Sequence, residues 1–82
     1  MIDFQPNRAR GRGLAPTLVE QLAAAILRAI EEQTLRPGMS LPSVREFARL
    51  YEVSTFTVAS AYSRLVSQGW LAARPGAGYR VA

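Results

Sequence analysis

The chain has 82 residues, 49% of them hydrophobic and 20% charged, which suits one small globular domain and is not typical of disorder. It contains no cysteine, histidine or lysine, so all ten basic residues are arginine, and the formal net charge is +4. Disulfides, the usual zinc sites, Ser-His or Cys-His nucleophiles and Schiff-base chemistry are therefore excluded for this chain. We expect neither an enzyme nor a cofactor here. The basic balance favours a polyanionic partner, and a basic surface that is merely solvated is the alternative.

Residues 1–15 are expected to form a flexible basic arm, because Arg8, Arg10 and Arg12 stand between glycine and alanine residues. Such an arm can enter a DNA minor groove, or it can be a disordered leader. No run of apolar residues approaches the roughly eighteen that a membrane span needs, and no apolar stretch follows the charged start. We therefore expect no membrane span and no secretory signal. The lack of cysteine fits a cytoplasmic protein.

The first helix is expected to begin near Thr17 and to end near Gln33. Thr17 and Glu20 have the spacing of a capping box, in which a hydroxyl and a carboxylate satisfy free amides at a helix start. Apolar residues then recur at steps of three and four, which gives one buried face made of Val19, Leu22, Ala23, Ile26, Leu27 and Ile30. Pro37 and Gly38 predict the turn that follows.

The second and third helices are expected to follow one another with a very short connection. Ser43 and Glu46 repeat the capping-box spacing, and the apolar side of this second helix is Val44, Phe47, Ala48 and Tyr51. About three residues, 52–54, connect it to a third helix over residues 55–68, which Ser54 can cap. Helices joined this closely cross steeply, as in a helix-turn-helix, with Val53 pointing into the core. A three-helix bundle with a short loop is the alternative.

The periodicity changes after Gly69, which suits the C-terminal cap of the third helix. The segment WLAARPGAGYRVA predicts a β-hairpin, with Pro75, Gly76 and Gly78 at its tip. Its large apolar residues are expected to cover the helices: Trp70, Leu71, Tyr79 and Val81. The predicted fold class is therefore mainly α with a small β-hairpin, a winged helix-turn-helix of three helices plus a wing over residues 16–82.

The predicted third helix has two different faces at about 100° per residue. Its core face comprises Val58, Ala61, Tyr62, Leu65 and Val66, and its opposite face carries Phe56, Ser60, Ser63 and Ser67. Small outward side chains let a helix enter a DNA major groove, which is about 12 Å wide. Phe56 on this face can contact a base, such as a thymine methyl, or a sugar, can anchor a protein–protein contact, or can be an ordinary exposed aromatic residue.

Three arginines near these helices are candidates for DNA contacts. Arg45, at the start of the second helix, is predicted to contact a phosphate or a guanine, whereas plain solvation or an ion pair with Glu46 or Glu52 is the alternative. Arg49 projects on the same side one turn later. Arg64, on the flank of the third helix, is predicted to bind a phosphate or to form an intramolecular ion pair.

The stretch LRPGMSLPSVREFARLYEVSTFTVASAYSRLVSQGWLAARPGAGYRV resembles the DNA-binding domain of GntR-family bacterial transcription regulators. Four pieces carry the resemblance in order and spacing: Leu35–Ala48, Val53–Val58, Ala61–Gly69 and Arg74–Gly78. The resemblance implies that Arg45 approaches the operator, that Ser54 and Thr57 supply hydroxyls at the start of the recognition helix, and that Gly76 enters the minor groove. The full set of residues expected to bind DNA is Ser43, Arg45, Arg49, Ser54, Thr55, Phe56, Thr57, Ser60, Arg74, Gly76 and Gly78.

The chain also departs from the family pattern. Many relatives have a basic residue where this chain has Thr55, and some have another at Ala59, so a different or weaker site is expected. The tyrosine often found early in the first helix of relatives is missing.

The resemblance further implies a longer two-part protein, with a dimerising, effector-binding domain after this reader and a homodimer as the full-length form. The wording LPSVREFA, STFTV and RPGAGY is similar to the MocR-like subgroup, whose second half resembles a pyridoxal-phosphate aminotransferase. The competing function is a winged helix that binds protein through Phe56.

Overall fold

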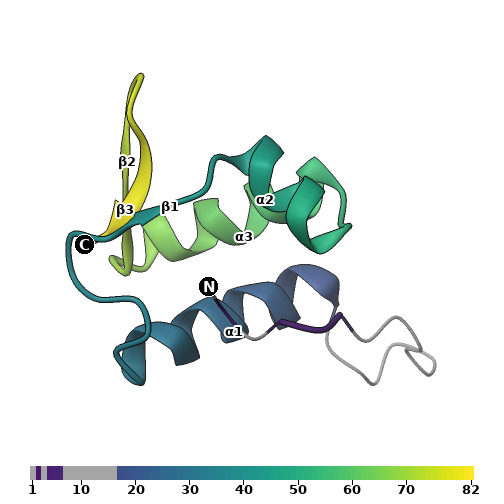
Figure 1. The fold of residues 1–82 in the computed structure, drawn as a ribbon, viewed down its shortest axis with the longest axis horizontal. Coiled ribbons are helices and arrows are strands. Elements are labelled where there is room, and N and C mark those ends of the chain that lie inside the picture. The colour runs from purple at the N-terminus through teal and green to yellow at the C-terminus, as the bar shows by residue number, and fades with distance from the viewer. Residues whose placement is uncertain (1, 3, 7–16) are drawn as a thin grey trace.

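Three helices and three short strands make up the computed structural model, which describes residues 2, 4–6 and 17–82. In chain order they are α1 (Leu18–Glu31), β1 (Ser40–Leu41), α2 (Val44–Tyr51), α3 (Thr55–Ser67), β2 (Leu71–Arg74) and β3 (Gly78–Val81). In Figure 1, α1 runs below α3, while α2 and the β2–β3 hairpin rise above it. The predicted fold class, a winged helix-turn-helix, is confirmed. No helix in the described part of the chain combines the length and apolar character needed to cross a membrane.

Each helix begins at a hydroxyl residue that accepts a hydrogen bond from a backbone amide. At α1 the capping box is complete: Thr17 Oγ1 accepts from the Glu20 amide at 3.1 Å, and the Glu20 carboxylate accepts from the Thr17 amide at 2.8 Å. At α2 only half of the predicted box forms. Ser43 accepts from the amide of Glu46, but the Glu46 carboxylate bonds to Arg49 instead of returning to the cap. The charged partner one turn on outcompetes a neutral amide because ionic hydrogen bonds are stronger.

The corner between α2 and α3 consists of residues 52–54, as predicted. Glu52 takes a left-handed backbone conformation with φ of 56°, which stops α2 and reverses the chain. The amide of Val53 then donates to the carbonyl of Ala48 at 3.1 Å, and the Val53 side chain is half-buried against the core. The tight corner therefore holds α2 directly against α3.

The sheet has the order β1-β3-β2 and is antiparallel throughout. The β2–β3 hairpin was predicted, but β1 was not. It pairs Ser40 with Arg80 and Leu41 with Tyr79, so it joins the wing to the loop before α2. One expectation for the hairpin is wrong in part: Trp70 remains 38% exposed. It precedes β2 and lies at the base of the wing, whereas Leu71 and Val81 are buried as expected.

The core joins all three helices to the wing through Tyr62. Its ring is fully buried and lies 5.9 Å from the Phe47 ring of α2 and 4.6 Å from the Tyr79 ring of β3, between centroids. The Tyr62 hydroxyl donates to the carbonyl of Pro42 at 2.8 Å, just before α2 begins. Leu22 and Ile26 of α1 are also fully buried in this core. Tyr62 therefore holds α2, α3 and the wing in one fixed arrangement.

This burial makes stability sensitive to alkaline pH. The pKa of Tyr62 is raised above its ordinary value of 10.0, mainly because the side chain is buried. The nearby charges of ionised Tyr79 and Tyr51 raise it further. The unfolded chain therefore loses this proton before the folded chain does, so the free energy of unfolding should fall as the pH rises past about 10. Tyr62→Phe should make that fall shallower, although it lowers stability at neutral pH by about 0.5–1.5 kcal/mol through the lost hydrogen bond. Urea unfolding followed by circular dichroism from pH 8 to 11 measures both effects, and parallel pH curves would contradict the assignment.

The expected flexible arm needs correction at its first residues. Ile2 and Phe4 are buried in the core, at 7% and 8% exposure. The Ile2 amide donates to the Tyr51 hydroxyl at 3.3 Å, and that hydroxyl donates back to the Ile2 carbonyl at 3.1 Å. The segment packs against the core because its two large apolar side chains leave water and because Tyr51, at the end of α2, bonds to it. The arginines of the predicted arm at positions 8, 10 and 12 lie outside the described residues.

Candidate nucleic-acid interface

The outward face of α3 carries small, uncharged polar side chains and one aromatic side chain, Phe56. Phe56 is 74% exposed, and along the same stripe Ser63 and Ser67 are exposed and Ser60 is half-buried. Four residues of the predicted core face are buried, namely Val58, Ala61, Tyr62 and Leu65, and the fifth, Val66, is half-buried. The helix can therefore approach another surface closely along this stripe.

The first turn of α3 does not present all the hydroxyls that were predicted to bind DNA. Ser54 and Thr55 are exposed, and Ser54 Oγ accepts from the Thr57 amide at 3.0 Å. Thr57, in contrast, is only 6% exposed, and its hydroxyl lies 2.9 Å from that of Ser54. Thr57 sits on the flank of the helix that the core covers, and its hydroxyl supports the Ser54 cap. The Ser54 hydroxyl keeps a hydrogen free to donate when Thr57 supplies the shared one.

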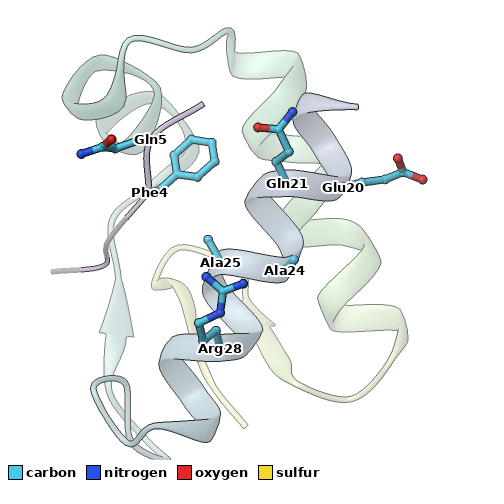
Figure 2. Close-up of a pocket in the computed structure, with 7 residues that line it drawn as sticks. All are labelled: Phe4, Gln5, Glu20, Gln21, Ala24, Ala25 and Arg28. Atoms are coloured by element: carbon cyan, nitrogen blue, oxygen red, sulfur yellow. The ribbon is translucent and has the colours of Figure 1, made fainter. Parts of the chain in front are cut away.

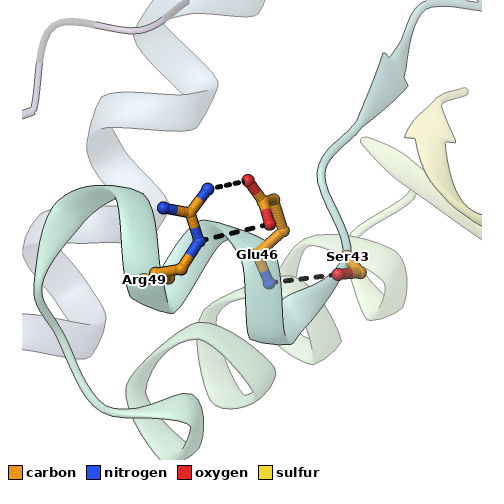
Figure 3. Close-up of polar contacts among 3 residues, drawn as sticks. All are labelled: Ser43, Glu46 and Arg49. Carbon is orange, nitrogen blue, oxygen red and sulfur yellow. Dashed lines mark hydrogen bonds and ion pairs between the residues drawn. The ribbon is translucent and has the colours of Figure 1, made fainter.

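Helix α2 offers two exposed arginines with different partners. The Arg45 side chain makes no hydrogen bond or ion pair with any residue that the structure describes. Arg49 pairs with the carboxylate of Glu46 through two nitrogens, as Figure 3 shows, and this bond and charge raise the pKa of Arg49. Ser43, at the start of α2, is exposed. The guanidinium of Arg45 is therefore available to an external anion, whereas that of Arg49 is already partly neutralised.

The wing presents a tight turn with one arginine on each strand. The turn after β2 is closed by the Ala77 amide, which donates to the Arg74 carbonyl at 2.9 Å. Gly76 and Gly78 have φ near +77° and +78°, a region that glycine occupies without strain. Both glycines and Arg74 are exposed, as the prediction requires. The backbone at Gly76 can therefore approach a partner closely.

Arg80 is a basic residue of the wing that was not among the predicted DNA contacts. It lies on β3, opposite Ala72 of β2 and Ser40 of β1, and is half-buried. Because side chains alternate along a strand, it points to the sheet face opposite Tyr79, which packs on Tyr62. The alternation of Tyr79, Arg80 and Val81 was the signal that could have found it.

The charges of the chain are distributed unevenly. Residues 53–82 form the last part of the corner, α3 and the wing, and they contain three arginines and no acidic residue. Among the described residues, three of the five acidic side chains belong to α1 and its C-terminal end, namely Glu20, Glu31 and Glu32. The positive potential therefore lies on the half of the domain that holds the exposed stripe of α3 and the wing.

A pocket of about 300 Å³ lies elsewhere, between residues 4–5 and one side of α1. Phe4 and Arg28 border it, and Ala24 and Ala25 are among its lining residues (Figure 2). None of its lining residues comes from α2, α3 or the wing. The pocket is thus not part of the candidate interface.

A family model described as bacterial regulatory proteins, gntR family, matches residues 18–81. The HTH-type transcriptional regulator YdcR of Escherichia coli K12 is 43% identical over 63 residues, which cover 77% of this chain and 14% of YdcR. The regulator Rv0792c of Mycobacterium tuberculosis is 42% identical over 71 residues, covering 87% of this chain and 26% of that protein. The matched part of the chain spans only 14% to 26% of the length of these two curated relatives.

Two solved structures are also similar to this chain. The DNA-binding domain of AraR in complex with operator ORE1 matches with a TM-score of 0.85 and 26% identity, over 100% of both chains. YtrA from Sulfolobus acidocaldarius, a GntR-family transcription factor, matches with a TM-score of 0.75 and 34% identity, over 85% of this chain and 72% of that one.

Proposed function

Because the chain belongs to the gntR family of bacterial regulatory proteins, we propose that it is the operator-reading domain of a transcription regulator. It binds double-stranded DNA sequence-specifically, with α3 in the major groove and the wing, residues 74–78, against the neighbouring minor groove. The observation that carries this proposal is the likeness, over the whole length of both chains, to a domain solved on its operator. The acid-free surface of α3 and the wing supports it, since a polyanion approaches there without repulsion.

The residues of the interface then divide by role. Arg45 and Arg74 bind phosphates or a guanine edge, and Ser43 and Ser54 donate to phosphates at the starts of α2 and α3, where the helix dipoles also favour negative charge. Thr55, Phe56 and Ser60 face the base edges. Gly76 and Gly78 bring the wing backbone against the minor groove, and Thr57 holds the Ser54 cap rather than touching DNA.

Salt dependence tests the proposal. With about four to six phosphates neutralised, log affinity should fall linearly with log salt at a slope of roughly −4 to −5. We would measure fluorescence anisotropy of the 82-residue chain with a labelled mixed-sequence duplex of about two helical turns, from about 50 to 200 mM salt. No binding at the lowest salt, or a slope near zero, would refute the DNA-binding role.

A protein-binding role is the second candidate, because Phe56 is 74% exposed and aromatic residues often anchor protein interfaces. The same titration separates the two functions. A chain that ignores DNA at low salt but depends on Phe56 for a protein contact would favour this alternative.

The rest of the protein is also a matter of proposal. We infer that the domain acts in the cytoplasm as part of a longer homodimeric protein, whose second domain binds a small-molecule effector. Dimers bind two half-sites, which raises the affinity above that of one domain. The match takes 14% of YdcR but 26% of Rv0792c, so relatives of very different lengths share this reader. A long relative such as YdcR has room for a second half like an aminotransferase, which the resemblance to the MocR-like subgroup implies.

A further inference from the structure

We propose that Phe56 makes the domain specific for thymine by packing against the C5-methyl group of one or two thymines in the major groove. This inference rests on the proposed function, because it requires α3 to lie in that groove. It adds the chemical feature that the helix reads and the side chain that reads it.

Phe56 lies at the end of α3 that would meet a base first. It lies in the first turn of α3, two residues after the Ser54 cap, and 74% of its surface is exposed. Recognition helices contact base edges mainly through their N-terminal residues. The ring therefore stands where a base would be met first, and its rigid apolar surface is not used by the fold.

The residues around Phe56 at the start of α3 are all uncharged. Between residues 53 and 63 there is no charged side chain, so the start of α3 cannot form the two-bonded arginine–guanine contact that most often reads a base. The hydroxyls of Thr55 and Ser60 accept and donate, so they bond to any base edge with little discrimination. Hydrogen bonding from this helix start thus supplies little specificity.

Apolar contact is the remaining way for this surface to discriminate. The thymine C5-methyl group is the apolar feature of the major groove, and cytosine, adenine and guanine lack it. Ser60 and Ser63, which follow Phe56 on the stripe, are small enough to let the ring come close to the floor of the groove. Phe56 and the methyl group would each leave water on contact.

Removing single methyl groups tests this inference directly. Duplexes that bind the 82-residue chain are first selected from a random library, and each thymine is then replaced in turn by deoxyuridine, which keeps the hydrogen bonds but lacks the methyl. One or two replacements should weaken binding by the wild type about three- to tenfold, as expected for losing one buried methyl. The same replacements should leave Phe56→Ala unchanged, because the partner of the methyl group is already gone. Dissociation constants come from anisotropy at low salt.

Two further variants define the outcome. Phe56→Leu should retain part of the sensitivity to methyl removal, and Leu50→Ala, which removes an exposed apolar side chain from α2, should keep all of it. If no deoxyuridine weakens the wild type, or if each weakens Phe56→Ala equally, the thymine contact is wrong although DNA binding stands. If no duplex is selected at all, the proposed function fails and this inference fails with it.

Discussion

Arg45→Ala should lower the affinity for a selected duplex by about 5- to 150-fold, which corresponds to about 1–3 kcal/mol, without changing thermal stability. Arg45 is exposed in the first turn of α2 and has no partner among the residues that the structure describes. Its side chain therefore contributes little to the fold, and its full charge is available to a phosphate or a guanine. Anisotropy titrations and thermal unfolding by circular dichroism measure the two quantities.

Two control variants change charges whose surroundings the structure describes. Arg28→Ala removes the same charge from α1, beside the pocket and away from the interface, so it should change affinity by much less. Glu46→Gln releases Arg49 from its ion pair and removes a negative charge from α2, so it should strengthen binding. If Arg45→Ala and Arg28→Ala weaken binding equally, the assignment of α2 to the interface is wrong.

The salt series also identifies the group that Arg45 contacts. If it binds a phosphate, the variant should lose affinity for all duplexes, and the salt slope should become less steep by about 1. If it binds a guanine edge, the loss should be confined to duplexes that carry that base. Both results are compatible with the proposed function, and they differ in what Arg45 adds to specificity.

The parts of the fold that the sequence predicted correctly are those with local causes. A helix start depends on a hydroxyl residue and the backbone amide three positions later, so the caps Thr17 and Ser54 were predicted correctly. A helix face depends on the period of 3.6 residues, so the buried side of α3 was predicted as well. The hairpin follows from the turn residues around Gly76. None of these features needs knowledge of what lies across the molecule.

The parts that could not be predicted depend on partners distant in sequence. Strand β1 has two residues and no periodicity of its own, and it exists because β3 pairs with it. Thr57 was predicted to contact DNA because it matches a hydroxyl of the family pattern, and only the packed core shows that it is covered. Ile2 and Phe4 carry no helix or strand pattern, so nothing in their own segment indicates that Tyr51, 49 residues after Ile2, receives them.

This N-terminal segment leads to the second large expected effect. Phe4→Ala should lower the free energy of unfolding by about 1–3 kcal/mol, and deletion of residues 2–6 should have a similar effect. Burial of Ile2 and Phe4 contributes about 3–6 kcal/mol in total, and the two hydrogen bonds to Tyr51 contribute about 1–3 kcal/mol more. Fixing the backbone of the segment costs roughly 1 kcal/mol per residue, so the net gain is modest. Phe4→Ala removes the largest contact of the segment, so the segment should detach and its remaining contacts should be lost with it. For a domain of this size the melting temperature should fall by about 4–24 °C.

The design of the variants separates packing from charge and from general sensitivity. Deleting residues 2–6 leaves Arg8, Arg10 and Arg12 in place but also removes the negative charge of Asp3, so Asp3→Asn is the matched control for any change in DNA affinity. Gln5→Ala changes an exposed neighbour of Phe4 and should alter stability by less than about 0.5 kcal/mol. Tyr51→Phe removes both hydrogen bonds to Ile2 but keeps the ring that packs edge-on against Phe4, with centroids 6.0 Å apart, so it should fall between the two. An unchanged melting temperature for Phe4→Ala would mean that the segment does not pack on α1 and α2 in solution, and would restore the flexible arm that the sequence predicts.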